Sequence, residues 1–423
     1  MSTEPFFRRR GRWMLAGAML VCAGVAQAAD DELPSLPDPS PAPAPSAAPA
    51  ALRLLVEGAA GSVDVRGDGQ QDLRRAAVDL RYERNWGAWR FAFSDRLDDF
   101  HPVPAGERST RNSLRELRAG WSGESITVEA GRVNLRNGPA FGYNPTDYFR
   151  ESALRTVTTA DPVALRENRL GTVMLTATVL GSSGSASLAL APEIRQTRSD
   201  APMSPDWGRT NHTDRALLTF SSAASQRLNG QLLVLGERGR GTQVGVNATA
   251  LVSDALVAYG EASTGRGPDL LQQSLGQTGP QRRLQRASVG FTYTFPARLS
   301  LTLEGEYNGA GLDRAQWTLL KGGGPGAYAR FVDLTQSSLE IGSRRAWIAH
   351  LAQKDAGIKN LDVSAFVRGN AVDHSRLIWA EARYHWNKFD AALQWQRFSG
   401  RQDSEFGAYP YRQVVQVIGV WYF

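Results

Sequence analysis

Residues 298–308 read Arg298-Leu-Ser-Leu-Thr-Leu-Glu-Gly-Glu-Tyr-Asn308, with an apolar residue, a glycine or a tyrosine at every second position. In an extended chain, successive side chains point to opposite sides. The three leucines therefore share one face, and Glu304 and Glu306 share the other. Such alternation predicts a β-strand with one apolar and one polar face.

The same period-two pattern recurs along the chain, for example in 89–94, 287–295 and 389–396. A soluble β-sandwich alternates too, so two further features decide the class. The alternating stretches are about ten residues long, which is the length that crosses a bilayer at a tilt. Aromatic residues also gather near the ends of the apolar faces, as in interfacial girdles; they are Trp89, Trp121, Tyr307, Tyr384 and Trp386. The pattern therefore predicts a transmembrane barrel.

We predict an all-β fold, a transmembrane antiparallel up-and-down β-barrel of eighteen strands, with sixteen as the alternative count. The strands are expected near 52–65, 73–84, 88–97, 113–122, 125–132, 169–179, 185–195, 214–222, 228–237, 242–252, 255–263, 284–295, 298–308, 337–351, 358–367, 375–386, 389–398 and 412–423. Short and long connections are expected to alternate strictly. Tight turns such as Pro296-Ala297 belong at the periplasmic side, and the long loops belong outside the cell. An even count leaves both termini periplasmic.

The chain before the barrel divides into two expected segments. Residues 1–28 resemble an export signal, with arginines, an apolar core and the cleavage-site sequence Ala26-Gln27-Ala28. Residues 29–51 are rich in proline and alanine, which predicts an extended periplasmic linker. The barrel is expected over 52–423. The one cysteine, Cys22, falls in the signal, so disulfide and thiol chemistry are not expected.

The last strand ends Val417-Ile-Gly-Val-Trp421-Tyr-Phe423. A terminal phenylalanine after alternating apolar and aromatic residues resembles the assembly signal of Gram-negative outer-membrane proteins, with Trp421 and Phe423 as its key residues. The resemblance implies insertion by the barrel-assembly machinery into outer-membrane lipid and lipopolysaccharide. Gly419 lies one residue closer to the end than in the common form of the signal.

A barrel of sixteen to eighteen strands is too wide for its own side chains to fill. The polar faces of the predicted strands carry charges that need water, so we expect a wet lumen. The expected lumen-facing residues are Arg81, Arg118, Glu304, Glu306, Glu381 and Arg383. The same residues could instead form stabilising ion pairs across the wall.

The connection 133–168 is the third predicted external loop and contains Gly138-Pro-Ala-Phe141-Gly-Tyr-Asn144-Pro-Thr-Asp147. In placement and length it resembles the loop that folds inward and narrows the pore of general porins. Its Gly-Arg strand end and Asn-Pro-x-Asp sequence resemble other proteobacterial porin and polysaccharide-export barrels. The resemblance implies a pore constriction built from Arg132, Arg136, Asn144, Asp147, Arg150, Arg155, Asp161, Arg166 and Arg169. An external, salt-bridged cap is the alternative.

These features imply a channel for small hydrophilic solutes, with a preference for anions if the arginines dominate. The alternatives are a polysaccharide or lipid export component and a barrel that binds or adheres through its loops. No enzyme is expected, because no histidine is followed two positions later by serine. No cofactor, metal site or nucleic-acid partner is expected either; Gly322–Gly324 is expected to be a flexible external loop. The oligomer could be a monomer or a homotrimer.

Overall fold

The computed structural model describes residues 52–101, 108–225, 227–277 and 279–423. The expected signal peptide, 1–28, and linker, 29–51, lie outside the described residues. The barrel is one closed antiparallel sheet of eighteen strands, which confirms the predicted fold class and strand count.

Every strand pairs with its sequence neighbours, and β1 pairs with β18 to close the sheet. The strands are β1 Leu52–Val65, β2 Gly69–Trp86, β3 Trp89–Phe100, β4 Ser109–Ser122, β5 Ile126–Val133, β6 Thr172–Gly181, β7 Gly184–Ala191, β8 Arg215–Ser225, β9 Leu228–Glu237, β10 Gly241–Ser253, β11 Leu256–Gly267, β12 Arg282–Thr294, β13 Leu299–Asn308, β14 Arg345–Gln353, β15 Leu361–Asn370, β16 Arg376–His385, β17 Phe389–Ser399 and β18 Tyr411–Tyr422. Closure removes the free edges that an open sheet would expose.

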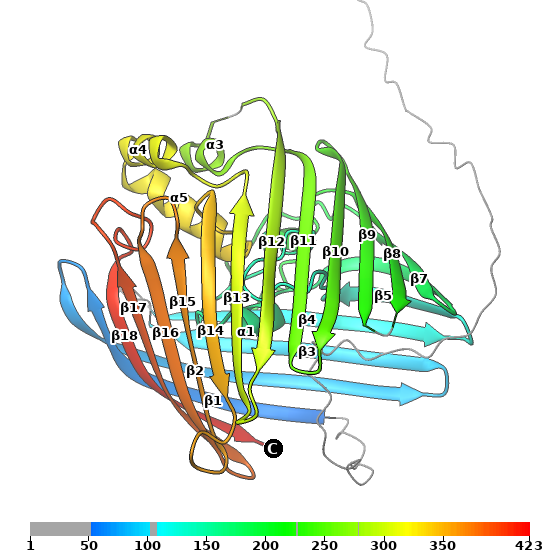
Figure 1. The fold of residues 1–423 in the computed structure, drawn as a ribbon, viewed down its shortest axis with the longest axis horizontal. Helices are drawn as coiled ribbons and strands as arrows, with labels where there is room; N and C mark the ends of the chain where they lie inside the picture. Colours follow the sequence, from blue (N-terminus) through cyan, green and yellow to red (C-terminus); the bar gives the residue numbers. More distant parts are fainter. Residues whose placement is uncertain (1–51, 102–107, 226, 278) are drawn as a thin grey trace, which may run out of the picture.

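The seam between the first and last strands runs from Leu55 opposite Tyr422 to Val65 opposite Tyr411. The backbone N–H of Phe423 continues this ladder and donates to the carbonyl of Leu54 at 3.0 Å. The start of β1 and the C-terminus therefore lie together at the short-turn end of the barrel (Figure 1).

Residues paired in register share a face of the sheet, so each face can be followed around the barrel. The face that carries the leucines of β13 continues into apolar side chains on every neighbouring strand, and many of these are exposed. Val289 on β12 is 66% exposed, Leu393 on β17 is 54% exposed and Val417 on β18 is 58% exposed. An exposed apolar belt of this kind is the lipid-facing surface of a membrane barrel.

Two details of the connections differ from the prediction. Short and long connections do not alternate strictly, because 66–68, 238–240 and 371–375 are short although they lie on the loop side. The strand predicted at 337–351 begins only at Arg345. Of the predicted residues before it, Ser337 ends a helix, and 338–344 form an irregular connection to the strand.

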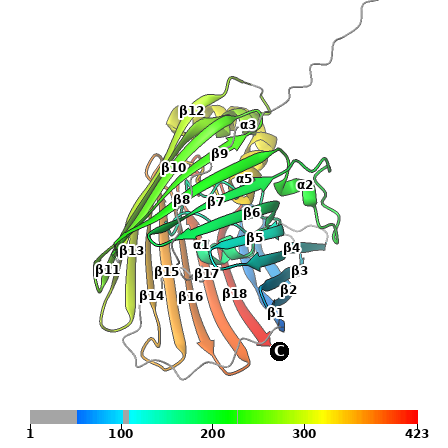
Figure 2. The ribbon, with the colours of Figure 1, turned by 90° about the vertical axis from the view of Figure 1, so that its right-hand side faces the viewer.

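In the described part of the chain, five helices lie in the loops: α1 Pro162–Glu167, α2 Trp207–Thr210, α3 Leu270–Leu275, α4 Arg314–Gly322 and α5 Gly324–Ser337. The triple glycine expected to be a flexible loop is instead the junction of α4 and α5. Helices α3, α4 and α5 gather over the loop end of the barrel (Figures 1 and 2), around a buried core that includes Trp317, Leu320 and Phe331. Among the described residues, no helix has the length and apolarity needed to span a bilayer.

Candidate functional site

The connection between β5 and β6, residues 134–171, runs through the interior of the barrel. Phe141 stacks on His350 of β14, with ring centroids 4.4 Å apart. Thr146 Oγ1 accepts from Asn247 of β10 at 3.2 Å, and Asn168 Oδ1 accepts from Arg115 of β4 at 2.8 Å. These strands lie on different sides of a closed sheet, so a segment that contacts all of them crosses the lumen.

Two buried carboxylates of the inner wall hold the middle of this segment. Glu304 of β13 accepts from the backbone N–H groups of Phe141 at 2.7 Å, Gly142 at 3.1 Å and Tyr143 at 3.0 Å. The Tyr259 hydroxyl also donates to Glu304, at 2.8 Å. Each of these donors would lose its partner without the carboxylate, and a buried donor without a partner is costly.

Glu261 of β11 is the second of these carboxylates. It accepts from the Ala140 N–H at 3.0 Å, from the Asn144 side-chain amide at 3.1 Å and from the Thr146 hydroxyl at 2.6 Å. Gly138 lies against this carboxylate with a φ of +87°, and a Cβ there would lie 2.3 Å from a Glu261 oxygen. The site therefore needs glycine both for its backbone conformation and for its close approach to the wall.

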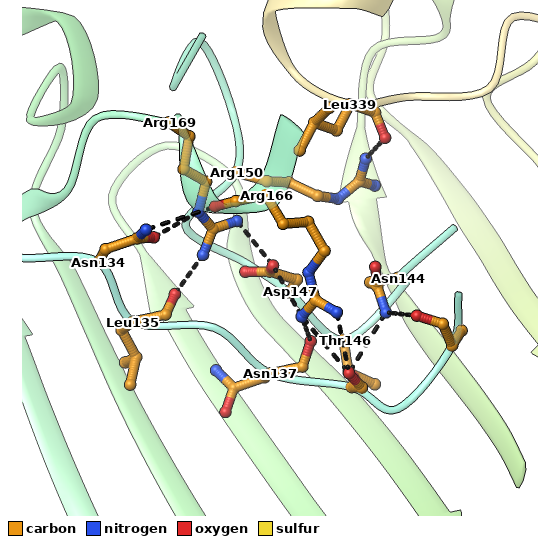
Figure 3. A network of polar contacts seen from close by, with 12 residues as sticks. Asn134, Leu135, Asn137, Asn144, Thr146, Asp147, Arg150, Arg166, Arg169 and Leu339 are labelled. Atoms are coloured by element: carbon orange, nitrogen blue, oxygen red, sulfur yellow. Dashed lines mark hydrogen bonds and ion pairs between the residues drawn. The ribbon is translucent and has the colours of Figure 1, made fainter. Parts of the chain in front are cut away.

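A buried ion-pair network closes the segment on itself (Figure 3). Arg169 donates to Asp147 at 2.6 Å and to the Asn134 side-chain oxygen at 2.7 Å, and the side chains of Arg169 and Asp147 are each 1% exposed. Arg166 donates to the carbonyl of Asn137 at 3.1 Å. Both arginines thus tie the end of the segment to its beginning.

Arg150 joins the segment to the residues that follow α5. Its guanidinium donates to the carbonyls of Ser338 at 3.0 Å and Leu339 at 2.7 Å, and pairs with Glu340 at 2.8 Å. It also lies 5.0 Å from the centroid of the Tyr143 ring. Burial alone would lower the pKa of the Arg150 guanidinium. The negative charge of Glu340 opposes this effect, and the pKa is raised above its ordinary value. The segment is therefore tied to the connection between α5 and β14.

The other predicted constriction residues differ in their surroundings. Arg132, at the end of β5, donates to the carbonyl of Gly171 at 3.0 Å, and Arg155 donates to the carbonyl of Ser204 at 2.6 Å. Asp161 caps α1 by accepting from the N–H of Val163 at 3.2 Å. Arg136 is exposed, and within the described residues its side chain has no hydrogen bond or ion pair shown. Arg136 is thus the arginine of this set that is open to solvent.

The expected lumen-facing charges share the face of the sheet that contacts the segment, and most are paired. Arg81 donates to Asp79 at 3.1 Å, Arg383 donates to Glu381 at 2.8 Å, and Arg118 bonds to Glu129. Glu306 pairs with Arg368 at 2.8 Å, and Arg368 also donates to the carbonyl of Gly142 at 2.6 Å. Compensated charges of both signs therefore line this wall.

Between the segment, α5 and the wall of β14–β17 lies an open cavity of about 200 Å³. Its lining is mixed, with apolar groups such as Phe141 and Leu377 beside the charged groups Arg150, Arg368 and Glu405. Polar and apolar contacts are therefore both available to a small solute there.

One cluster at the loop end has metal-binding residue types. Oxygen or nitrogen atoms of Glu151, His212 and Glu237 lie within 4.8 Å of one another. Arg240 already bonds to Glu151 at 2.6 and 2.9 Å and lies 3.3 Å from Glu237. Burial would raise the pKa of Glu151, but the bonds from Arg240 lower it to about 2. The guanidinium therefore takes the place that a metal cation would need.

Several residues that hold the segment were not among the predicted site residues: Glu261, Glu340, Asn247 and Arg368. Glu261 and Asn247 had one available signal, since each lies on the polar side of an alternating strand. Nothing in their local sequence indicates that a segment more than a hundred residues away would bind them.

The closed barrel with its interior segment defines an outer-membrane β-barrel of eighteen strands. No family model matches the sequence, and no curated protein matches it either. Solved structures do match the fold. OccK8 (OprE) of Pseudomonas aeruginosa is similar with a TM-score of 0.53 and 11% identity, over 88% of this chain and 97% of that one. OccAB1 of Acinetobacter baumannii is similar with a TM-score of 0.54 and 11% identity, over 88% and 96%.

OccK5 (OpdH) of Pseudomonas aeruginosa matches with a TM-score of 0.52 and 10% identity, over 88% of this chain and 97% of that one. All three are outer-membrane porins with closed barrels. At this identity the likeness concerns the fold. It confirms the predicted porin-like barrel architecture.

Proposed function

We propose that this protein is an outer-membrane channel through which small hydrophilic solutes pass by diffusion. The observation that carries the proposal is the course of segment 134–171, which crosses a wide lumen and is held there by buried carboxylates and ion pairs. A fixed segment across the lumen narrows the passage to the size of small solutes, while the sheet of the barrel stays closed. Export of a wide polymer would need the space that the segment fills.

The constriction is proposed to combine both signs of charge. Arg136 supplies an exposed positive charge, while Arg166, Arg169 and Asp147 keep the segment in place. Because the wall arginines are paired with carboxylates, the preference for anions over cations should be modest. Opposite charges across a narrow passage orient polar solutes.

The remaining assignments of partners are also proposals. Lipid and lipopolysaccharide surround the belt, and the barrel-assembly machinery recognises the last strand through Trp421 and Phe423. Trp421 packs on Phe389 with ring centroids 4.8 Å apart on the outer face, where another protein can reach it. A catalytic role is not proposed, since the structural neighbours are porins.

Planar-bilayer recording of the refolded protein tests the proposal. We expect discrete open-channel steps, and a larger conductance after deletion of 140–160. Absence of any conductance from correctly folded protein would contradict the channel function. An unchanged conductance after the deletion would contradict the constriction alone.

A further inference from the structure

The outer wall formed by β11 to β17, labelled in Figure 1, carries a row of arginines at its extracellular end. Glu261 and Glu304 point into the lumen, so side chains an odd number of positions away point to the lipid. The five outward arginines are Arg266 on β11, Arg283 on β12, Arg345 on β14, Arg376 on β16 and Arg397 on β17. Each is exposed and lies within three residues of the loop end of its strand.

Aromatic residues fix the height of this arginine row relative to the membrane. Trp347 lies on the same face two positions below Arg345, and Trp395 lies two positions below Arg397. Tryptophan on a barrel's outer face marks the interface between hydrocarbon and head groups. The guanidinium groups therefore lie at the level of the lipid head groups, where an outward charge costs little.

The arginine row has no negative partner within the described residues of its own wall. On β11 to β17, every outward position holds an uncharged residue or an arginine. Arg266 and Arg283 are paired directly across two neighbouring strands. Among the described residues, the one hydrogen bond of either guanidinium runs from Arg283 to the hydroxyl of Thr264, at 3.3 Å. Like charges opposite each other destabilise a sheet, so an anion bound between the two guanidinium groups would stabilise this pair.

The wall on the other side of the seam has the opposite character. The outer faces of β1, β2 and β3 carry the carboxylates Asp64, Asp72, Asp95 and Asp99. Arg74, an exposed outward arginine on β2, has Asp72 within 3.4 Å. The β1–β3 wall is therefore mixed in charge, whereas the arginines of the β11–β17 wall have no outward carboxylate on their own strands.

We propose that the arginine row binds the phosphate groups of lipopolysaccharide, the phosphorylated glycolipid predicted to surround this barrel. Guanidinium groups bind phosphate through paired hydrogen bonds, and clusters of basic residues near a membrane surface recognise phosphorylated head groups. Six strand spacings of about 4.8 Å separate β11 from β17, which is room for several phosphates along the row. A lipid with several phosphates should be held more firmly than one with a single phosphate.

The experiment uses the full barrel in detergent, titrated with purified lipopolysaccharide and followed by native mass spectrometry. The double variant Arg266→Gln/Arg283→Gln should bind lipopolysaccharide at least about tenfold more weakly than the parent. The matched control, Arg74→Gln/Arg84→Gln, removes the same charge from the outer face of β2 and should bind as the parent does. Both variants should keep the heat-dependent gel mobility and the conductance of the parent, which separates this result from misfolding and from the channel function.

Two comparison lipids identify the chemistry. Dephosphorylated lipopolysaccharide and phosphatidylglycerol should each bind at least about tenfold more weakly than intact lipopolysaccharide. The variant Arg266→Lys/Arg283→Lys, which keeps charge and loses the paired bonds, should be intermediate. Equal loss of binding in the test and control variants would overturn the proposal. Binding of either comparison lipid as tightly as intact lipopolysaccharide would also overturn it.

Discussion

At the scale of single residues, two arginines of the interior segment have opposite surroundings. Arg169 is buried against Asp147, and Arg136 is exposed. Arg169→Gln should lower the free energy of unfolding by about 3–5 kcal/mol, because it leaves the Asp147 carboxylate buried without its partner. Arg136→Gln should change stability by less than about 0.5 kcal/mol.

The same pair separates stability from selectivity. Arg136→Gln should shift the reversal potential in a salt gradient toward cations, since an open positive charge is lost from the lumen. Urea unfolding and bilayer recording of the two variants measure both effects. An Arg136→Gln channel with unchanged selectivity would remove this residue from the constriction.

The Glu304 carboxylate is the residue-scale anchor of the segment. Glu304→Gln replaces one acceptor oxygen by an N–H₂ group that faces backbone donors, so it should destabilise the segment by about 2–3 kcal/mol. Hydrogen exchange should then speed up over Phe141–Tyr143 more than in β13 itself. Equal exchange rates over Phe141–Tyr143 in the variant and the parent would show that the other contacts hold the segment.

At the scale of elements, the loop 400–410 between β17 and β18 should respond to pH. Glu405 accepts from the Asn370 side chain at 2.7 Å, and its N–H donates to Asp373 at 2.7 Å. Burial, with the nearby charge of Asp373, raises the pKa of Glu405 to about 7, although Arg368 opposes the shift. The folded loop thus favours the protonated acid, and this stability is present at acidic pH and lost as pH rises through about 7.

Hydrogen exchange corrected for its intrinsic pH dependence checks this prediction. The free energy of opening of loop 400–410 should fall between about pH 5 and pH 8, by an amount on the order of 2–3 kcal/mol. Glu405→Gln should remove the change, and Asp403→Asn, at an exposed position in the same loop, should retain it. A pH dependence that persists in Glu405→Gln would assign it to another group.

The elements also show where sequence patterns suffice. Strands could be predicted because lipid on one side and water on the other impose a period of two on nearly every strand. Helices α4 and α5 were missed although a signal was present: Asp313 and Gln316 form a capping box, and Trp317 and Leu320 lie one turn apart on the buried side. The partners of the interior segment could not be predicted, because Glu261 and Glu304 reach it only through closure of the barrel.

At the scale of the whole molecule, the stability of the barrel depends on closure between β1 and β18. Two glycines of β1 lie at this seam. Gly61 approaches the partner strand so closely that an added Cβ would lie 2.0 Å from the carbonyl oxygen of Val415. At Gly58 the nearest atom would be a Trp421 ring carbon at 3.9 Å, an ordinary contact.

Gly61→Ala should therefore push the first and last strands apart, at a cost of about 1–3 kcal/mol. Gly58→Ala, three residues away on the same strand, should be neutral within about 0.5 kcal/mol. Because the seam joins the two ends of the chain, its weakening should lower the unfolding temperature of the entire barrel as one transition. Heat-dependent gel mobility of the two variants measures this. A Gly61→Ala barrel as stable as Gly58→Ala would mean that the seam can shift to accept the methyl group, and that closure does not limit the stability of the fold.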